Sequence, residues 1–324
     1  MMKKHSTSFA LLLAALAYFV PTVAGGAPAA YTACTTIAIL AVMSYGADLI
    51  LSYLGEVSLG HTIFWAAGGY AAAMLAVNLG WNGWATAGAA VGVSIVLASV
   101  LGLATLRPRA FVFSLVTYAA AVVAMEVAFN WSFLGGSDGI VGVPPLSLTL
   151  FGWGVAGASN VELWPVAWLL LLVTLLFIHR FRRSRLGTSA LMVQMNPDLA
   201  TALGIDAHKV RFAVFIVSAP ISALAGWLYA YQRAYVGPDM FESYFLVLML
   251  TAIVIVGRRL LLGPLVGTAL IIVQQMFFSI GGDGDKIVLG TVLAAILLLW
   301  PKGLVGVWDF LTVRMAMRAG SSQS

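Results

Sequence analysis

Apolar runs long enough to cross a lipid bilayer dominate this sequence and leave few folds open to it. A helix needs about 20 apolar residues to span a hydrocarbon core of about 30 Å. Of the 324 residues, 61% are apolar and 9% charged, against about 25% charged in an ordinary soluble domain. The pattern predicts an all-α, polytopic membrane protein with about ten spans in one domain, residues 1–324. The predicted spans are residues 8–24, 31–54, 58–79, 85–106, 110–130, 162–179, 210–230, 243–257, 264–281 and 287–300.

The positions of lysine and arginine predict how these spans are oriented. Basic residues tend to stay on the cytoplasmic side during insertion. With the N-terminus inside and ten crossings, both termini are cytoplasmic and only Arg233 and Lys286 fall outside. A wrong number of spans would mix the two sides, so this partition supports the count. Fifteen basic residues are placed inside: Lys3, Lys4, Arg107, Arg109, Arg180, Arg182, Arg183, Arg185, Lys209, Arg211, Arg258, Arg259, Lys302, Arg314 and Arg318.

Two segments leave the count open by one or two spans. Residues 8–24 follow Lys3 and Lys4 and precede a run of small residues, a pattern that also fits a cleaved secretory signal peptide. The second and third predicted spans are joined by the brief hinge LGEVSLGH, so one segment around residues 54–62 is open to a re-entrant path. Cleavage of the first segment would leave nine spans and keep the rest of the predicted topology.

The stretch RSRLGTSALMVQMNPDLATALGID, residues 183–206, is the longest run of mixed polar character in the chain. It joins the sixth and seventh predicted spans, so the topology places it in a cytoplasmic loop, residues 180–209.

This loop contains the start and stop signals of a short helix. Asn196 suits an N-cap, Pro197 the first helical position, and Asp198 the positive end of the helix dipole. Gly204 supplies a left-handed stop. These signals predict a two-turn helix from Pro197 to Leu203.

The predicted helix has one apolar side, formed by Leu199, Ala202 and Leu203. A helix this short is unstable alone and requires a partner. It could lie along lipid headgroups, form part of an ordered loop, or dock into a groove on a soluble protein. The spacing of Ala200 and Gly204, in a loop that follows a basic cluster, resembles the coupling loop of ABC importer permeases.

Four stretches in order resemble the branched-chain amino acid type of permease subunit of bacterial ABC transporters. They are GADLILSYLGEVSLGHTIFWAAGGY at residues 46–70, NWSFLGGSDGI at 130–140, the Gly-Pro-x-x-Gly pattern at 263–267 and the Pro-x-Gly-Leu-x-Gly pattern at 301–306. The resemblance covers roughly residues 35–306. The matching positions of the first stretch include Ser58, Leu59, Gly60, His61, Phe64, Gly68 and Tyr70.

The resemblance implies a function and a set of partners. It implies a multi-pass subunit of the bacterial inner membrane that imports branched-chain amino acids, or a related small polar solute such as urea or an amide. Two ATPase subunits, a second related permease and a periplasmic substrate-binding protein would complete the transporter. The residues implied to couple to the ATPase are Asn196, Pro197, Asp198, Leu199, Ala200, Leu203 and Gly204.

The chain departs from the family's usual pattern at several positions. Asp48 stands where the family usually has Asn, Glu56 where it has a neutral residue, and Val122 where it has Glu. Arg258 and Arg259 occupy what is usually a Gly-rich turn. The coupling loop also lacks the family's usual acids at residues 196–197. These differences bear on the substrate more than on the transport class.

A few polar residues within the predicted spans are candidates for a translocation path. An ionised side chain at the bilayer centre costs on the order of 2.5 to 3.5 kcal/mol, so a retained acid faces a wet cavity, a partner or, near a span end, the headgroups. The amides Gln274 and Gln275 need an interhelical partner or a pore. The predicted path residues are Asp48, Ser58, His61, Glu126 and Gln274.

No motif indicates catalysis, a cofactor or a metal. The chain has no phosphate-binding loop, one cysteine, Cys34, and four scattered histidines. Ser58 and His61 could meet on a helix, which would suit a membrane-embedded enzyme, but no third group orients them. The net charge of +5 is carried by topology signals, so no nucleic-acid partner is expected. The competing transport hypothesis is a secondary transporter or channel that works alone.

The segment at residues 131–161 is the predicted periplasmic loop. Two adjacent prolines, Pro144 and Pro145, and a GGSDG turn indicate an ordered loop rather than a domain. Acidic residues make the predicted outer face suited to basic groups on a docking protein, or simply a solvated rim. They are Asp138, Glu162, Asp239, Glu242, Asp283 and Asp285.

Overall fold

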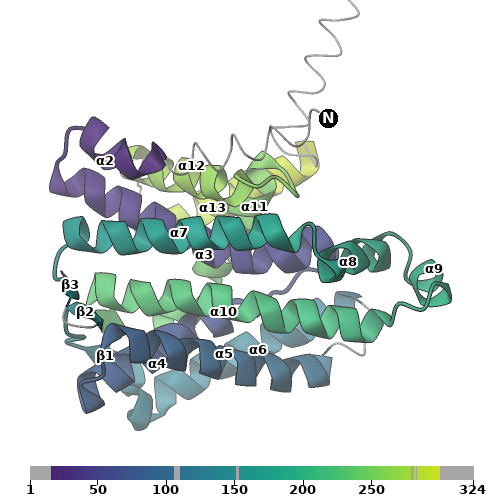
Figure 1. Ribbon diagram of the computed structural model, residues 1–324, viewed down its shortest axis with the longest axis horizontal. Helices are drawn as coiled ribbons and strands as arrows, with labels where there is room; N and C mark the ends of the chain where they lie inside the picture. Colours follow the sequence, from purple (N-terminus) through teal and green to yellow (C-terminus); the bar gives the residue numbers. More distant parts are fainter. Residues whose placement is uncertain (1–15, 106–109, 151–152, 279–280, 282, 300–324) are drawn as a thin grey trace, which may run out of the picture.

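The computed structural model describes residues 16–105, 110–150, 153–278, 281 and 283–299, and these form a bundle of closely aligned helices (Figure 1). Such helices are stable in lipid because their side chains are apolar and every backbone polar group is hydrogen-bonded within the helix. The long helices are α3 (Pro28–Tyr53), α4 (Thr62–Leu79), α5 (Gly83–Thr105), α6 (Ala110–Asn130), α7 (Asn160–Phe181) and α10 (Ala207–Arg233). The shorter ones are α2 (Val20–Val23), α8 (Arg185–Met195), α9 (Pro197–Ala202), α11 (Ser243–Val256), α12 (Gly263–Phe278) and α13 (Asp283–Leu299).

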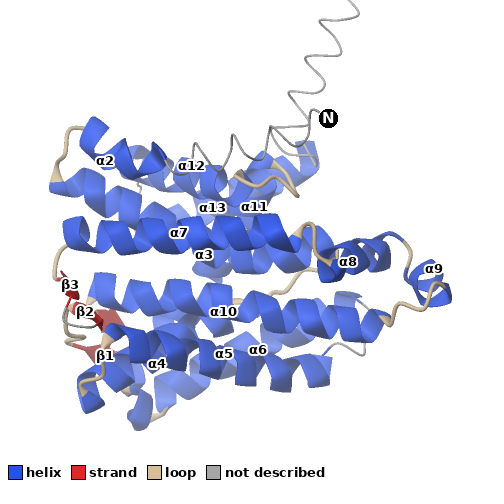
Figure 2. Ribbon diagram, viewed as in Figure 1, coloured by secondary structure: helices blue, strands red, loops and turns tan. Residues whose placement is uncertain are grey.

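Two small antiparallel sheets lie together at one end of the bundle (Figure 2). Strand β1 (Ile140–Val141) pairs with β4 (Tyr235–Val236). Strand β2 (Leu146–Leu150) pairs with β3 (Trp153–Gly157) in a hairpin. The described part of the predicted loop at residues 131–161 contains three of these strands, which the all-α prediction did not include.

The all-α polytopic architecture is confirmed in its coarse form. Among the residues that the structure describes, six helices, the long ones above, are long and apolar enough to cross a membrane. Helices α11, α12 and α13 overlap the last three predicted spans; α11 and α12 are shorter than predicted, and α13 begins earlier and is longer. Of the first predicted span, residues 8–15 lie outside the described residues. The count of ten spans and the cytoplasmic placement of both termini remain predictions.

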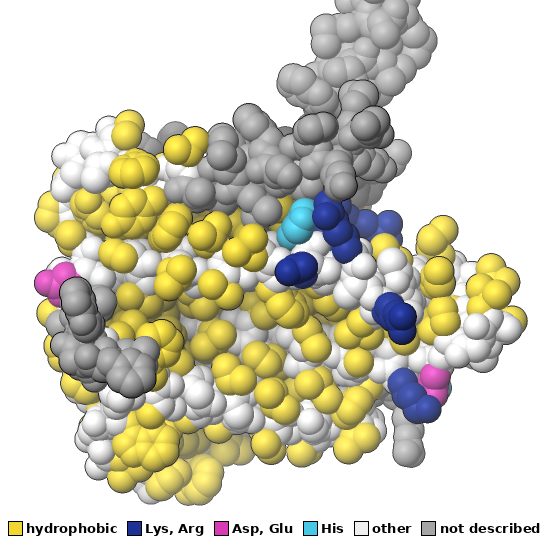
Figure 3. Space-filling model, in the orientation of Figure 1, with side chains coloured by type: hydrophobic (Ala, Val, Ile, Leu, Met, Phe, Trp, Pro, Cys, Tyr) yellow, Lys and Arg dark blue, Asp and Glu magenta, His cyan; other side chains and the backbone are white. Residues whose placement is uncertain are grey.

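The charged residues divide between the two ends of the bundle (Figure 3). We call the end that carries α8 and α9 the basic end, and the end that carries the strands the strand end. Arg233 and Lys286, the two basic residues predicted to lie outside, are at the strand end, where Lys286 Nζ lies 3.0 Å from Glu242 Oε2. The described basic residues at the other end are Arg180, Arg182, Arg183, Arg185, Lys209, Arg211, Arg258 and Arg259.

Helix α3 is the centre of the core and packs closely against α10, which also packs closely against α4. Every residue from Ala38 to Leu54 is buried. Glycines permit the close approach: a Cβ added to Gly226 would lie 1.8 Å from the Trp65 carbonyl oxygen, and one added to Gly68 would lie 2.1 Å from that of Ala223. We call α3, α4 and α10 the seam, and glycines allow its helices to approach closely.

Candidate functional site

The structure contains a short capped helix, α9, which projects from the basic end (Figure 1). The Asn196 side chain accepts a hydrogen bond of 3.0 Å from the backbone N–H of Leu199. Gly204 has a φ of +80°, and the N–H of Ile205 donates to the carbonyl oxygen of Ala200 at 3.0 Å. The helix predicted from Pro197 is thereby confirmed, with its last helical residue at Ala202.

The apolar side of α9 is left open. Leu199 is 58% exposed and Leu203 68%, while Ala200 is buried against the rest of the loop. Met195, at the end of α8, is 82% exposed and extends this apolar tip. These exposed apolar groups lie beyond several basic side chains that separate them from the apolar surface of the bundle, and they indicate a surface that another molecule covers (Figure 3).

An open pocket of about 540 Å³ separates α9 from the start of α10. Asp206 caps α10, with Oδ1 accepting from the N–H groups of His208 and Lys209 at 3.1 Å each. The pocket lies beside the apolar tip and is lined by Pro197, Asp198, Thr201, Gly204, Ile205, Asp206, Ala207, His208 and Arg211.

The connection between α3 and α4, residues 54–61, is a largely buried non-helical segment. Helix α6 supplies its polar partners: Ser114 Oγ donates to the Val57 carbonyl oxygen at 2.7 Å, and the Leu59 N–H donates to Thr117 Oγ1 at 3.2 Å. Both α3 and α4 are long enough to span, so the segment open to a re-entrant path is this connection rather than either helix.

Ser58 and His61 are buried in this connection without hydrogen-bond partners. Ser58 is 4% exposed and His61 0%, and no hydrogen bond of ordinary geometry reaches the Ser58 hydroxyl or either ring nitrogen. They therefore do not form the serine–histidine pair of an enzyme. Trp65 Nε1 and the Tyr70 hydroxyl, further along α4, are likewise buried and unpaired. Unsatisfied buried polar groups are rare and call for a functional explanation.

Asp48 is buried but satisfied. It accepts a hydrogen bond of 2.6 Å from Ser52 Oγ, one turn later on α3. Ser52 Oγ in turn accepts from the backbone N–H of Arg259 at 3.2 Å. Asp48 therefore belongs to a polar network at the basic end of α3, beside the turn between α11 and α12.

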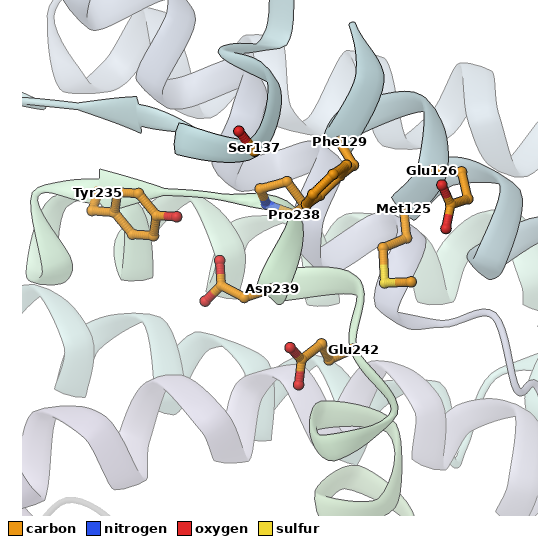
Figure 4. A pocket seen from close by; sticks show the side chains of 8 residues that line it. All are labelled: Met125, Glu126, Phe129, Ser137, Tyr235, Pro238, Asp239 and Glu242. Carbon is orange, nitrogen blue, oxygen red and sulfur yellow. The ribbon is translucent and has the colours of Figure 1, made fainter. Parts of the chain in front are cut away.

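Glu126 lies at the strand end, far along the bundle from Asp48. It lines an open pocket of about 400 Å³ (Figure 4). Two further acids, Asp239 and Glu242, line the same pocket, and burial, with the charge of Glu242 adding to it, raises the pKa of Asp239 above its ordinary value. The remaining lining residues are Met125, Phe129, Ser137, Tyr235 and Pro238.

Helix α12 carries the two amides. Gln275 exchanges hydrogen bonds of 3.1 and 2.9 Å with the Tyr244 hydroxyl of α11, the interhelical partner that the sequence predicts for an amide at this depth. Gln274 is half-buried beside it. The five predicted path residues thus do not converge: Ser58 and His61 share the buried connection, and Asp48, Glu126 and Gln274 lie at separate places.

Sequence reasoning missed several residues that the structure makes prominent. Trp65 carries no signal, because an aromatic residue in an apolar helix is usually packing. Tyr70 matches the family pattern but is not among the predicted site residues. Glu56 and Arg259 stand out in the sequence as departures from the family, but their partners do not. The structure places Glu56 Oε1 3.0 Å from Arg211 Nε, an ion pair across the basic end of the seam.

Apolar spans, charges confined to the two ends and a small capped helix beyond one end define the class: this is a multi-pass helical membrane protein. The chain belongs to the family described as the branched-chain amino acid transport system permease component, whose model matches residues 30–299. Proteins of this family are transporter permease subunits and are not themselves enzymes.

Three relatives illustrate the family. The permease protein LivM of the high-affinity branched-chain amino acid transport system of Salmonella typhimurium is 24% identical over 84% of this chain and 68% of its own length. LivM of Escherichia coli K12 is 23% identical over the same shares. LivH of Escherichia coli K12 is 24% identical over 82% of this chain and 91% of its own length. No solved structure matches the chain.

Proposed function

We propose that this chain is a permease subunit of a bacterial ABC importer of the inner membrane. The solute is a branched-chain amino acid or a related small polar compound such as urea or an amide. Separate subunits hydrolyse the ATP. The family match over residues 30–299 and relatives named as branched-chain amino acid permeases support this function.

The observation that carries the proposal is the open apolar side of α9. A helix this short gains little stability from its own hydrogen bonds, so it is held by its caps and its loop. Leu199 and Leu203 remain largely exposed and suit a groove on an ATPase subunit. Closure of two such subunits on ATP would push α9 and shift the bundle between inward-facing and outward-facing packings.

The unpaired polar groups of the α3–α4 connection support a solute path beside the seam. Ser58 and His61 are buried in the state described here, so a state that admits water would give them partners. Glu126 would stand at the outer mouth of this path. The case for Asp48 and Gln274 as path residues is weaker. Asp48 already accepts a hydrogen bond from Ser52 within its own polar network.

The strand end would receive the periplasmic binding protein, and the basic end would then face the cytoplasm. Asp138, Glu162, Asp239 and Glu242 all lie at the strand end, so a docking partner with basic residues would be favoured. A second, related permease would complete the pore, with lipid covering the remaining apolar faces.

A double substitution, Leu199→Asp with Leu203→Asp, tests the docking role. Both side chains are exposed, so the permease should insert and fold normally. The complete transporter should lose co-purification of its ATPase subunits and ATP-driven uptake of radiolabelled leucine, because two carboxylates would have to be buried in the groove. Thr201→Asp adds a carboxylate on the same helix at an exposed residue outside the implied coupling set, so it is the matched control and should leave both intact. ATPase capture and uptake at the wild-type level in the double variant would refute the docking role.

A further inference from the structure

Arg259 ties three parts of the basic end together. Its Nε donates to the Ser52 carbonyl oxygen at 3.0 Å, and its backbone N–H donates to Ser52 Oγ at 3.2 Å, both in the last turn of α3. The other end of the guanidinium, Nη2, donates to Gln194 Oε1 of α8. One side chain in the turn between α11 and α12 thus holds α3 and α8 at the same time.

Gln194 is placed to carry motion from α9. It lies in the last turn of α8, two residues before Asn196, the cap of α9. Its amide also packs on the turn after α3, where a Cβ added to Gly55 would lie 2.8 Å from Gln194 Nε2. A movement of α9 would therefore be passed to Gln194 directly, because Asn196 both ends α8 and caps α9.

The backbone at Arg259 is held in an unfavourable conformation. Its φ of +65° lies in the left-handed region, which only glycine adopts without cost. Apart from glycine, Ala234 is the only other residue with a positive φ in the described part of the chain. A strained residue whose side chain makes contacts in two directions is typical of a functional position.

From these contacts we propose that Arg259 is the positioning residue that transmits movement of α8 and α9 to the core helix α3. It grips Gln194 on one side and Ser52 on the other, and Ser52 donates to Asp48 deeper in α3. These contacts extend from the last turn of α8, next to α9, to the buried Asp48 at the basic end of α3. This inference rests on the proposed function, in which α9 receives work from an ATPase.

Arg259→Gly is the sharpest variant, because glycine removes the side chain and also suits the positive φ, so the subunit should fold at least as well as the wild type. The complete transporter, with its ATPases, second permease and binding protein, is reconstituted in liposomes with leucine as the probe. Uptake per ATP hydrolysed should fall about fivefold or more, the range of ordinary coupling between sites. Leucine binding by the receptor and capture of the ATPase should not change.

Gln194→Ala should lower the same ratio, and the double variant should be no worse than either single one, because both remove the same link. Arg258→Gly, in the adjacent exposed position, is the matched control and should keep the wild-type ratio. A wild-type ratio in Arg259→Gly, or additive losses in the double variant, would overturn the role of Arg259. Absence of ATP-dependent uptake by the wild-type transporter would instead overturn the proposed function and this inference with it.

Discussion

Helices α3 and α6 have nearly the same hydropathy but opposite surroundings. Of the most apolar window of each helix, 83% is buried in α3 and 22% in α6. In water such a difference would appear in the sequence, because an exposed helix carries a polar face. In lipid a buried and an exposed helix can have the same composition, because hydrocarbon is as apolar as a protein core. Apolar character thus shows that a helix spans the membrane and says nothing about what it touches.

The seam and the outer helices differ instead in how closely backbones approach. On α10, Gly226 allows contact with α4 at a distance that any side chain would prevent. On α5, Gly88 and Gly92 face open space, with no heavy atom within 4 Å of an added Cβ. The same residue type therefore packs helices in one region and has no packing role in the other.

The largest expected effect comes from replacing a seam glycine. Gly226→Leu should abolish the folded subunit, because its Cβ alone would lie 1.8 Å from the Trp65 carbonyl oxygen, a backbone atom that cannot move aside. Gly92→Leu should insert and elute normally, since nothing lies near that position. Size-exclusion chromatography of the detergent-solubilised variants would compare them. A monodisperse Gly226→Leu variant would contradict the close crossing.

A second comparison measures the stability lost when a large apolar side chain is replaced by alanine in the seam and on an outer helix. Leu49→Ala, in α3 at 0% exposure, should cost stability near the lower end of about 2–5 kcal/mol. The lower end applies because a chain unfolded within the bilayer places this side chain in lipid, so only the cavity and lost contacts count. Val96→Ala on α5, where Val96 is 62% exposed, should change stability by less than about 0.5 kcal/mol. Equal losses in reversible unfolding from bicelles would show that both positions are packed.

Much of the fold could be predicted from the sequence, because lipid imposes strict length and composition on spans. The helix starting at Pro197 was also predictable, since Asn196, Pro197 and Gly204 are local signals that act within one or two turns. The partition of basic residues between the two ends follows from the same kind of counting.

The arrangement of the candidate site could not be predicted, because it depends on which helices meet. Asp48 and Glu126 look alike in the sequence, as single acids in apolar runs, yet one is hydrogen-bonded at the basic end and the other lines a pocket at the strand end. The pairing of Arg259 with Gln194 joins residues 65 positions apart. No local pattern records such a contact.

The smallest expected effect is a pH dependence at the basic end of the seam, where Glu56 meets Arg211 and Asp206 caps α10. Burial raises the pKa of Glu56 above its ordinary value of 4.5, although Arg211 opposes the shift. The stability that Glu56 contributes is therefore fully present below pH 4.5 and is lost as the pH rises through the folded pKa. The pKa of Asp206 is lowered, chiefly by the hydrogen bond from the Lys209 backbone N–H, so its contribution is present at neutral pH and lost on acidification.

These two carboxyls provide matched variants of opposite sign. Glu56→Gln keeps the shape of the buried group and removes its titration, so the melting temperature of the wild type relative to this variant should fall between pH 4 and pH 8. Asp206→Asn keeps a good N-cap, and the wild type should gain on it as the pH rises from below 3.8, the ordinary pKa of this carboxyl, to about 5. Thermal denaturation in detergent at several pH values measures both differences. If both melting-temperature differences between wild type and variant rose with pH, Glu56 would not be buried as described. It would instead reach water at the basic end, and the seam would be open there in the resting subunit.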